Sequence, residues 1–347
     1  MNPILVDVQR GGSVESQHRG ALAVVDADGA VVMSLGDIER PVFPRSAVKV
    51  LQALPLVASG AADRLGLDDA ELALACASHN GEEIHARTAA AMLAKAGLGI
   101  DALECGTHWP YLDTAVRALA AAGREPNALN NNCSGKHAGF LCLACALHGR
   151  PNLRDYVRGY VAAEHPVMRE VTAALQATTG VDLAAAPHGI DGCSIPTYAV
   201  PLRNLALAFA RVGTGIGLVA DHARAAQRLR RAVAKAPFMV AGTGRFDTRV
   251  MERLGERVFC KVGAEGVYCA ALPGPGLGVA IKVDDGNNAR AAEVVMAAVV
   301  EAFVALDTDE TAFIGGFSDA TLRNWNGREV GRLRASAALR TGLGQRG

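Results

Sequence analysis

The sequence predicts an α/β fold, of the α+β kind, in which one antiparallel sheet is built from both ends of the chain. Two observations predict it: strand-like segments occur near both ends, and the residues between them have mostly helical periodicity. We therefore expect a sheet lobe of residues 1–45 and 255–347 and an all-helical lobe of residues 46–254, with one functional site between them. Half of the 347 residues are hydrophobic, which is enough for a sizeable core.

Short apolar runs bounded by turn residues predict the strands. The opening strands are expected at residues 3–10, 20–26 and 30–35. The turn Asp26-Ala27-Asp28-Gly29 should join the last two as a hairpin. Further strands are predicted at residues 257–262, 265–271, 278–284 and 329–333, with a frayed tail after the last one.

Glycine and proline separate a series of predicted helices between these strands. The first helix runs from Ser46 to about Val57, because apolar residues recur there among good helix formers. The other helices are predicted at residues 83–96, 114–122, 137–147, 153–162, 166–177, 201–212, 220–234 and 288–306.

The charge balance excludes several classes of function. The chain has 35 Lys and Arg and 35 Asp and Glu residues, and no run of like charges, which argues against a nucleic-acid or anionic-membrane partner. Its longest apolar run, Ala138 to Leu147, is too short to cross a membrane, and its N-terminal residues lack the features of a signal peptide. We expect a cytoplasmic protein that acts on a small molecule and keeps its eight cysteines as free thiols.

Lysine is rare in this chain, since only six of its 35 Lys and Arg residues are lysines. Arginine cannot be deprotonated in a protein, so a position that must act as a base cannot be converted to it. Ser46 and Lys49 are three residues apart on a predicted helix, which puts the ammonium within reach of the hydroxyl. Because a serine needs a neighbouring base to become a good nucleophile, a neutral Lys49 would activate Ser46.

Two further motifs follow this Ser-x-x-Lys pair. Ser78-His79-Asn80 lies in a polar loop, and Lys261-Val262-Gly263 lies on a predicted strand. The order and placement of the three motifs are those of the serine β-lactamases and penicillin-binding proteins. We expect the two lysines to converge, so that burial and mutual repulsion keep one of them neutral.

The same arrangement assigns roles to the remaining polar groups of these motifs. Ser78 would relay a proton between Lys49 and Lys261, and Asn80 would orient a substrate amide. The backbone N–H groups of Ser46 and of a residue near Ala264 are plausible donors to an oxyanion.

Two glycine-rich polar stretches, residues 130–139 and 188–196, each contain a Cys-Ser pair. Their cysteines, Cys133 and Cys193, lie in predicted loops, where a cysteine is less often a core residue than on an apolar helix. A thiolate pair with a third ligand could hold Zn²⁺, but two such cysteines alone are a weak metal signal.

The motifs together resemble a known family. The segments that carry the resemblance are PRSAVKVLQALP, ASHNGE, NNCSGKHAGFL, GIDGCSIPTYA, KVGAEGVYCAALP and KVDDGNNARA. Over essentially its full length the chain resembles the class 3, Rhizobium etli-type L-asparaginases of the asparaginase II family. The resemblance implies a serine β-lactamase/glutaminase-like fold and a homodimer that hydrolyses L-asparagine to L-aspartate and ammonia.

The resemblance also implies roles for individual residues. The catalytic residues that it implies are Ser46 with Lys49 and Ser78 with Lys261. The zinc ligands that it implies are Cys133, Lys136 and Cys193, which would tune affinity for the substrate rather than perform the hydrolysis. The pocket residues that it implies are Arg45, Asn132, His137 and Asp191.

Other functions stay open at this point. A glutaminase or a penicillin-recognising enzyme would share the motifs, although the absence of an export signal counts against penicillin chemistry. A zinc- or amino-acid-binding regulator would not need intact serine-lysine pairs. A hydrolase with Cys133 as its nucleophile is a third alternative.

Overall fold

The structure, a computed structural model, describes residues 1–148 and 152–344. Contacts divide the chain into two units. The first unit consists of Met1–Ala47, Ala199–Gly217 and Glu256–Gly347, and the second of Val48–Tyr198 and Leu218–Gly255. This division differs from the predicted lobes chiefly in residues 199–217, which we expected in the helical lobe and which belong to the first unit.

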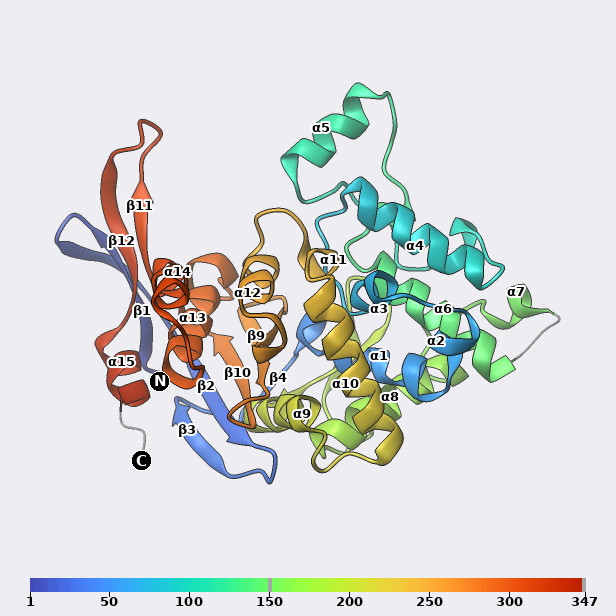
Figure 1. The fold of residues 1–347 in the computed structure, drawn as a ribbon, viewed down its shortest axis with the longest axis horizontal. Coiled ribbons are helices and arrows are strands. Elements are labelled where there is room, and N and C mark those ends of the chain that lie inside the picture. The colour runs from blue at the N-terminus through green and yellow to red at the C-terminus, as the bar shows by residue number, and fades with distance from the viewer. Residues whose placement is uncertain (149–151, 345–347) are drawn as a thin grey trace. The chain divides into compact units, whose positions relative to one another are not determined.

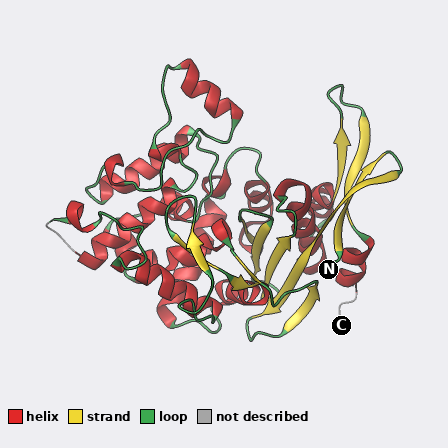
Figure 2. Cartoon of the chain, turned by 180° about the vertical axis from the view of Figure 1, so that it is seen from behind, coloured by secondary structure: helices red, strands yellow, loops and turns green. Residues whose placement is uncertain are grey.

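The first unit contains a sheet of eight strands, all paired in antiparallel fashion. Their order is β11-β12-β1-β2-β10-β9-β8, and β3 pairs with β2. Their bounds are β1 (Ile4–Arg10), β2 (Ser13–Asp26), β3 (Val31–Leu35), β8 (Phe259–Val262), β9 (Val267–Leu272), β10 (Leu277–Val283), β11 (Asp319–Arg323) and β12 (Glu329–Ala335). Strands from the two ends of the sequence are neighbours at β1–β12 and β2–β10 (Figures 1 and 2). The predicted antiparallel sheet built from both ends is confirmed.

Helices cover both faces of the central strands. Nearly every residue of β8, β9 and β10 is buried, and successive side chains of a strand point to opposite faces. The helices α9 (Leu202–Thr214) and α13 (Glu293–Phe303) pack on these strands. A Cβ at Gly278 of β10 would lie 1.9 Å from the carbonyl oxygen of Ala206, so only glycine lets α9 approach this closely. This packing explains why residues 199–217 belong to the sheet unit.

The end of the described chain is more ordered than we predicted. In place of a frayed tail, β12 is followed by α15 (Ala337–Gly344), whose Leu339 and Leu343 are buried. The Ser336 hydroxyl accepts a hydrogen bond from the Leu339 backbone N–H at 3.1 Å and so caps the start of this helix. Residues 345–347 of the predicted tail lie outside the described residues. The sequence analysis also missed α14 (Thr308–Ser318) and β11.

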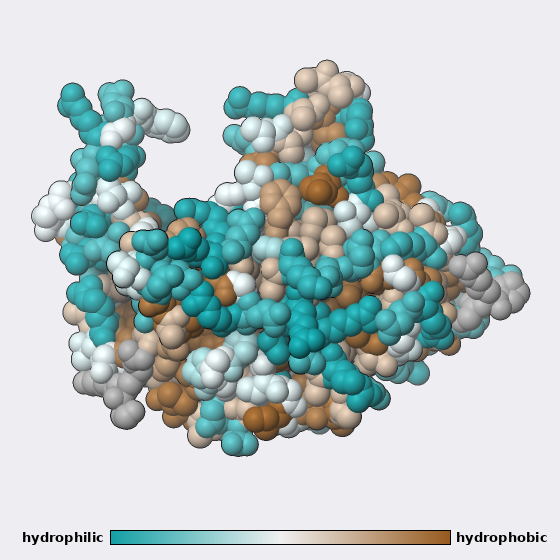
Figure 3. Space-filling model, viewed as in Figure 1, coloured by the Kyte–Doolittle hydropathy of each residue, from teal (hydrophilic) through white to brown (hydrophobic). Residues whose placement is uncertain are grey.

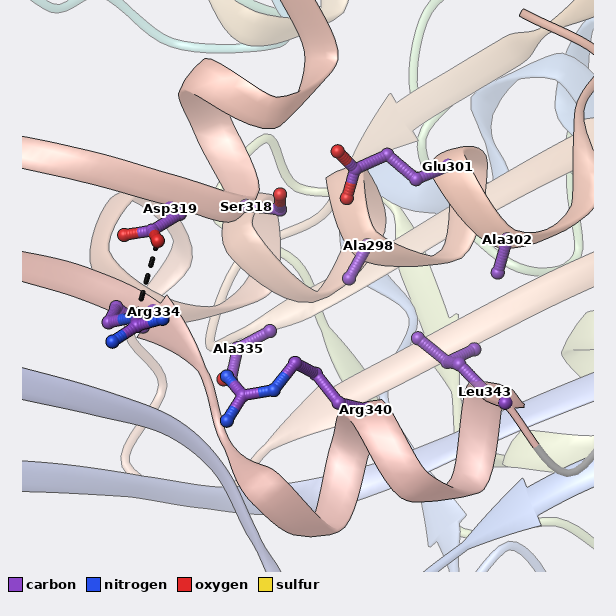
Figure 4. Close-up of a pocket in the computed structure, with 10 residues that line it drawn as sticks. Ala298, Glu301, Ala302, Ser318, Asp319, Arg334, Ala335, Arg340 and Leu343 are labelled. Atoms are coloured by element: carbon purple, nitrogen blue, oxygen red, sulfur yellow. Dashed lines mark hydrogen bonds and ion pairs between the residues drawn. The ribbon is translucent and has the colours of Figure 1, made fainter. Parts of the chain in front are cut away.

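The first unit also contains a pocket of about 380 Å³ between α13, α14, β12 and α15 (Figure 4). Arg334 in its wall pairs with Asp319 at 3.2 Å, and Arg340 donates to the carbonyl of Ala335. None of the residues singled out from the sequence lines it.

The second unit is built mainly of helices (Figure 1). Their bounds are α1 (Lys49–Ala58), α2 (Ala61–Arg64), α3 (Asp69–Ala75), α4 (Glu83–Lys95), α5 (Asp113–Ala121), α6 (Ser134–His148), α7 (Leu153–Tyr156), α8 (Pro166–Thr179), α10 (Ala220–Lys235), α11 (Phe238–Ala241) and α12 (Phe246–Leu254). Residues 134–144 of α6 are all buried, and this helix contacts α1, α3, α4 and α8. In contrast, α10 has an exposed face of hydrophilic residues (Figure 3). Across the described residues, no helix combines the length and the apolar character needed to cross a membrane.

Three predicted helices differ in detail. The helix expected from Ser46 begins as a 3₁₀ turn, Arg45–Val48, that continues directly into α1. The helix expected at residues 153–162 ends at Tyr156, and Gly159 beyond it has a φ of +70° that a helix does not allow. The helix expected at residues 288–306 opens with a π-helical turn, Asn288–Ala292, before α13.

Candidate active site

A buried lysine contacts a serine hydroxyl in the second unit. Lys49 is fully buried at the start of α1, and its Nζ lies 2.9 Å from Ser78 Oγ and 3.1 Å from Cys133 Sγ. It also donates to the carbonyl of Ala77. Burial lowers the pKa of Lys49 below its ordinary value, and the charge of Lys136 adds to this, although the Cys133 sulfur acts in the opposite direction. The environment therefore moves Lys49 towards the neutral amine that a base requires.

Backbone hydrogen bonds fix the loop that carries Ser78. The preceding helix, α3, starts with a capping box between Asp68 and Glu71. After α3 the chain is extended, and the Ser78 N–H donates to the carbonyl of Val240 at 2.8 Å. The Asn80 N–H donates to the carbonyl of Ala241 at 2.9 Å. The loop is therefore held against α11, which places the Ser78 hydroxyl beside Lys49.

Two cysteines and a second lysine lie beside this pair. Lys136 on α6 is 3.0 Å from Cys193 Sγ, which comes from the loop between β5 (His188–Ile190) and β6 (Pro196–Tyr198). A hydrogen bond from Cys193 lowers the pKa of Cys133 well below its ordinary value, and Lys49 and Lys136 lower it further. The same hydrogen bond raises the pKa of Cys193. The contact between the two thiols therefore moves their pKa values apart, with that of Cys133 lowered.

The two sulfurs act on the pKa of Lys136 in turn. Burial alone would lower the pKa of Lys136, but the sulfurs of Cys193 and Cys133 outweigh burial and raise it above the ordinary value. The site therefore combines a lysine whose pKa is raised, Lys136, with a cysteine and a lysine whose pKa values are lowered, Cys133 and Lys49.

The zinc site that the resemblance implies can be tested against these contacts. Cys133 and Cys193 are buried free thiols joined by a hydrogen bond, and the Lys136 nitrogen lies 3.0 Å from Cys193 Sγ. Sulfur and nitrogen are donors that Zn²⁺ prefers. Residues 1–148 and 152–344 contain no group of three or more His, Cys, Asp or Glu side chains that could hold a metal, so an amine ligand would be needed. Cys133, Lys136 and Cys193 therefore fit a zinc site if Lys136 binds the ion through its neutral amine.

The predicted substrate-binding residues of the second unit have unequal environments. His137 is fully buried, and burial holds its pKa well below the ordinary range, with Lys136 and Lys49 adding to the shift. Asp191 is half-buried, and its Oδ1 accepts from the Gly192 N–H at 2.7 Å. Because Cys193 follows two residues later, this carboxylate lies next to the cysteine pair.

The two predicted asparagines are held by neighbours. Asn80 accepts from Arg245 Nη1 at 3.1 Å and donates to the Thr243 carbonyl at 3.1 Å, so its amide is fixed in position. The Asn132 N–H donates to Nε2 of His108 at 2.9 Å. The side-chain amide of Asn80 is therefore oriented before any ligand arrives, whereas the contact of Asn132 fixes its backbone.

The first unit holds the remaining three predicted residues. Arg45 has a φ of +51°, an uncommon conformation for a residue other than glycine, and it begins the 3₁₀ turn that contains the half-buried Ser46. Lys261 is fully buried on the edge strand β8, and its Nζ donates to the Val262 carbonyl at 2.8 Å. A Cβ at Gly263 would lie 2.6 Å from the carbonyl oxygen of Pro44, so the end of β8 lies against the chain that enters this turn.

Sequence reasoning missed several residues that hold the site together. His79 is fully buried, accepts from the Gly81 N–H at 3.0 Å through Nδ1, and contacts Ser134 Oγ at 3.0 Å through Nε2. The Tyr160 hydroxyl lies 2.6 Å from His137 Nδ1. His79 follows the predicted catalytic serine Ser78 directly, and this position in the sequence could have identified it as a residue of the site. Tyr160 has no comparable signal, because it lies outside every motif.

One glycine sets the spacing between α6 and α3. A Cβ at Gly135 would lie 2.3 Å from Leu74 Cγ and 2.5 Å from its carbonyl oxygen. Gly135→Ala is therefore expected to destabilise the protein by about 1–3 kcal/mol, through overpacking beside Lys136. Thermal unfolding measures this. The matched control is Gly316→Ala on α14, where nothing lies within 4 Å and alanine should be neutral or stabilising. Equal stability of the two variants would contradict the close approach.

The fold and these contacts define the class of protein. It is an α/β protein in which the buried amine of Lys49, the hydroxyl of Ser78 and the thiols of two cysteines form one cluster. A sequence model described as L-asparaginase II matches residues 6–335, and the chain belongs to that family. The predicted family is thus confirmed, and it places the chain among the amidohydrolases. No curated protein matches the chain in sequence.

Several solved structures are similar to the chain at low identity. Mglu in its native form is 17% identical with a TM-score of 0.38, and the match covers 88% of this chain and 70% of that one. Mglu in its tris and glutamate form is 16% identical with a TM-score of 0.34, covering 84% and 61%. This chain thus spans less than two thirds of the matched chain in that second Mglu structure. A β-lactamase from Mycobacterium bovis is 14% identical with a TM-score of 0.36, covering 77% and 88%.

Proposed function

We propose that the protein is an L-asparaginase that hydrolyses L-asparagine to L-aspartate and ammonia through a serine activated by lysine. The observation that carries the proposal is the contact of 2.9 Å between the buried amine of Lys49 and the Ser78 hydroxyl. Membership in the L-asparaginase II family favours this amide over other substrates. The lowered pKa of Lys49 supports its role as the base.

The proposed reaction is acyl transfer in two steps. Ser46, deprotonated by Lys49 with help from Ser78 and Lys261, attacks the carbon of the side-chain amide. The leaving nitrogen takes a proton and departs as ammonia, which leaves an ester between the serine and the aspartyl group. Water then attacks this ester, and its cleavage releases aspartate and restores the serine hydroxyl.

Charge complementarity suggests how the substrate would bind. Asp191 would pair with the substrate ammonium, and His137 or a bound metal with its carboxylate. Arg45 and Asn132 would line the pocket. Asn80, whose own amide is fixed by Arg245 and Thr243, would orient the amide of the substrate.

We also propose that Cys133, Lys136 and Cys193 hold Zn²⁺ beside the substrate. When bound, the ion would supply a fixed positive charge that strengthens the binding of an anionic group. Lys136 and Cys193, which lie 3.0 Å apart, would supply two of the ligands, and Cys133 the third.

Removal of the metal is therefore expected to raise KM for asparagine several-fold and to leave kcat within about a factor of two. Steady-state ammonia release before and after dialysis against a chelator measures both constants, with metal content determined on the same samples. Zn²⁺ added back should restore KM, whereas Mg²⁺, which prefers oxygen ligands, should not. Complete loss of kcat without metal would contradict a role limited to affinity.

The proposed function is tested by timed ammonia release from asparagine and glutamine, measured side by side. We expect asparagine to be the better substrate by kcat/KM. A preference for glutamine would make the protein a glutaminase, and binding of asparagine without turnover would point to a regulator.

We further propose that the protein is a cytoplasmic homodimer. Sedimentation equilibrium would measure the mass of the assembly.

A second candidate is favoured by one observation. The hydrogen bond from Cys193 holds the pKa of Cys133 well below its ordinary value, and a thiol with a lowered pKa is more readily ionised to the nucleophilic thiolate. A hydrolase that uses Cys133 would lose all activity on Cys133→Ser, whereas the serine mechanism predicts a variant with raised KM and measurable turnover.

A further inference from the structure

A chain of buried hydrogen bonds ends at His137. The Glu104 backbone N–H donates to the Tyr160 hydroxyl at 3.1 Å, and this hydroxyl lies 2.6 Å from His137 Nδ1. Both side chains are fully buried. The Glu104 side chain accepts from the Gly159 N–H at 2.8 Å, which fastens the Tyr160 loop to the same segment. Tyr160 is therefore held rigidly against the histidine.

The direction of these hydrogen bonds follows from counting protons. The Tyr160 oxygen accepts from Glu104, and the phenol has one proton to donate. Within residues 1–148 and 152–344, His137 Nδ1 is its one hydrogen-bond acceptor. If His137 donated through Nδ1 instead, both the phenol proton and the Nε2 lone pair would be buried without partners. Donation by Tyr160 leaves a single group unsatisfied, so the imidazole proton lies on Nε2.

That remaining group is a donor without an acceptor. His137 Nε2 is buried and has no hydrogen-bond partner among the described residues. The neighbouring side chains Lys136 and Lys49 are amines and offer no oxygen acceptor. A buried N–H group without an acceptor is best satisfied by an anionic oxygen.

We propose that Tyr160 is a positioning residue that fixes the proton of His137 on Nε2, so that this N–H donates to the α-carboxylate of the substrate. The inference deepens the proposed function and rests on it for the identity of the substrate. It also predicts which substrates the site selects, namely primary amides that carry a carboxylate.

Three variants test this proposal. Tyr160→Phe removes the hydroxyl and keeps the ring. His137→Gln can place an amide N–H near the position of Nε2, whereas His137→Asn places its amide near Nδ1. Tyr198→Phe is the matched control, because the Tyr198 hydroxyl makes one long contact of 3.5 Å with Thr172. Thermal unfolding of each variant confirms that it is folded.

Two amides distinguish binding of the carboxylate from other roles. L-asparagine carries the α-carboxylate, and 3-aminopropanamide is the same molecule without it. We expect Tyr160→Phe to raise KM for asparagine about tenfold while kcat changes less, and to leave KM for 3-aminopropanamide unchanged. His137→Gln should retain more affinity for asparagine than His137→Asn, and Tyr198→Phe should match the parent protein. Equal effects on the two amides, or a fall in kcat with unchanged KM, would overturn the proposal.

A measurement independent of turnover separates this inference from the proposed function. Nitrogen NMR of the imidazole should show a protonated Nε2 and a bare Nδ1 in the parent protein, and a loss of this preference in Tyr160→Phe. L-aspartate, the proposed product, should bind about tenfold more weakly to that variant by calorimetry. A proton on Nδ1 would overturn the role of Tyr160 whatever the activity. The expected NMR result and aspartate binding, without any asparagine hydrolysis, would support this inference and overturn the proposed function.

Discussion

Ser46→Ala is expected to lower kcat for asparagine by about 10⁴-fold or more, because the proposed reaction cannot form its acyl intermediate without the hydroxyl. The fold should be unaffected, since Ser46 is half-buried in a 3₁₀ turn and the change removes one atom. Ammonia release measured over long times with concentrated enzyme gives the residual rate, and thermal unfolding verifies the fold.

Two further serine variants make this result specific. Ser59→Ala alters an exposed serine just beyond the other end of α1 and should leave kcat unchanged. Ser78→Ala removes the hydroxyl that contacts Lys49 and should reduce kcat by less than Ser46→Ala does. If Ser46→Ala kept its activity and Ser78→Ala lost it, the nucleophile would be Ser78.

Lys49→Arg should be nearly as damaging, with kcat lowered by about 10³-fold or more. A guanidinium keeps the positive charge but cannot give up its proton, so it cannot act as the base. The fully buried site also offers little room for a larger head group. Steady-state kinetics on folded protein measures the loss.

Lys235→Arg is the matched control for this substitution. Lys235 lies exposed at the end of α10 and pairs with Asp69 at 2.8 Å, a contact that arginine can also make. Its kcat should be that of the parent protein. If Lys49→Arg retained more than about a tenth of the parent kcat, Lys49 would serve as a charge rather than as a base.

Most of the sheet could be predicted because its strands have short-range signals. The turn at residues 26–29 marks the hairpin of β2 and β3, and apolar runs mark β8 to β10. The assignment of α9 to the sheet unit had no such signal, because it depends on the contact between Gly278 and Ala206 across a long stretch of sequence. Local periodicity carries no information about such pairings.

The same limit applies to the candidate site. Motifs pointed to Lys49, Ser78 and Cys133, and the structure brings these three together. Their supports could not be predicted: Tyr160 lies 23 residues from His137, and Arg245 lies 165 residues from Asn80. Each support is a single residue that makes one hydrogen bond to the residue it holds, so no repeated pattern marks it.

The pairing of β1 with β12 bears on how the protein is made. Val6 pairs with Ala335, so β1 leaves the ribosome more than 300 residues before the strand that covers its edge, and this side of the sheet can form only after β12 is made. During that time the edge of β1 is open to other chains, which makes it a point of aggregation. Nascent chains that stall before β12 is synthesised should therefore depend on chaperones more than completed ones do.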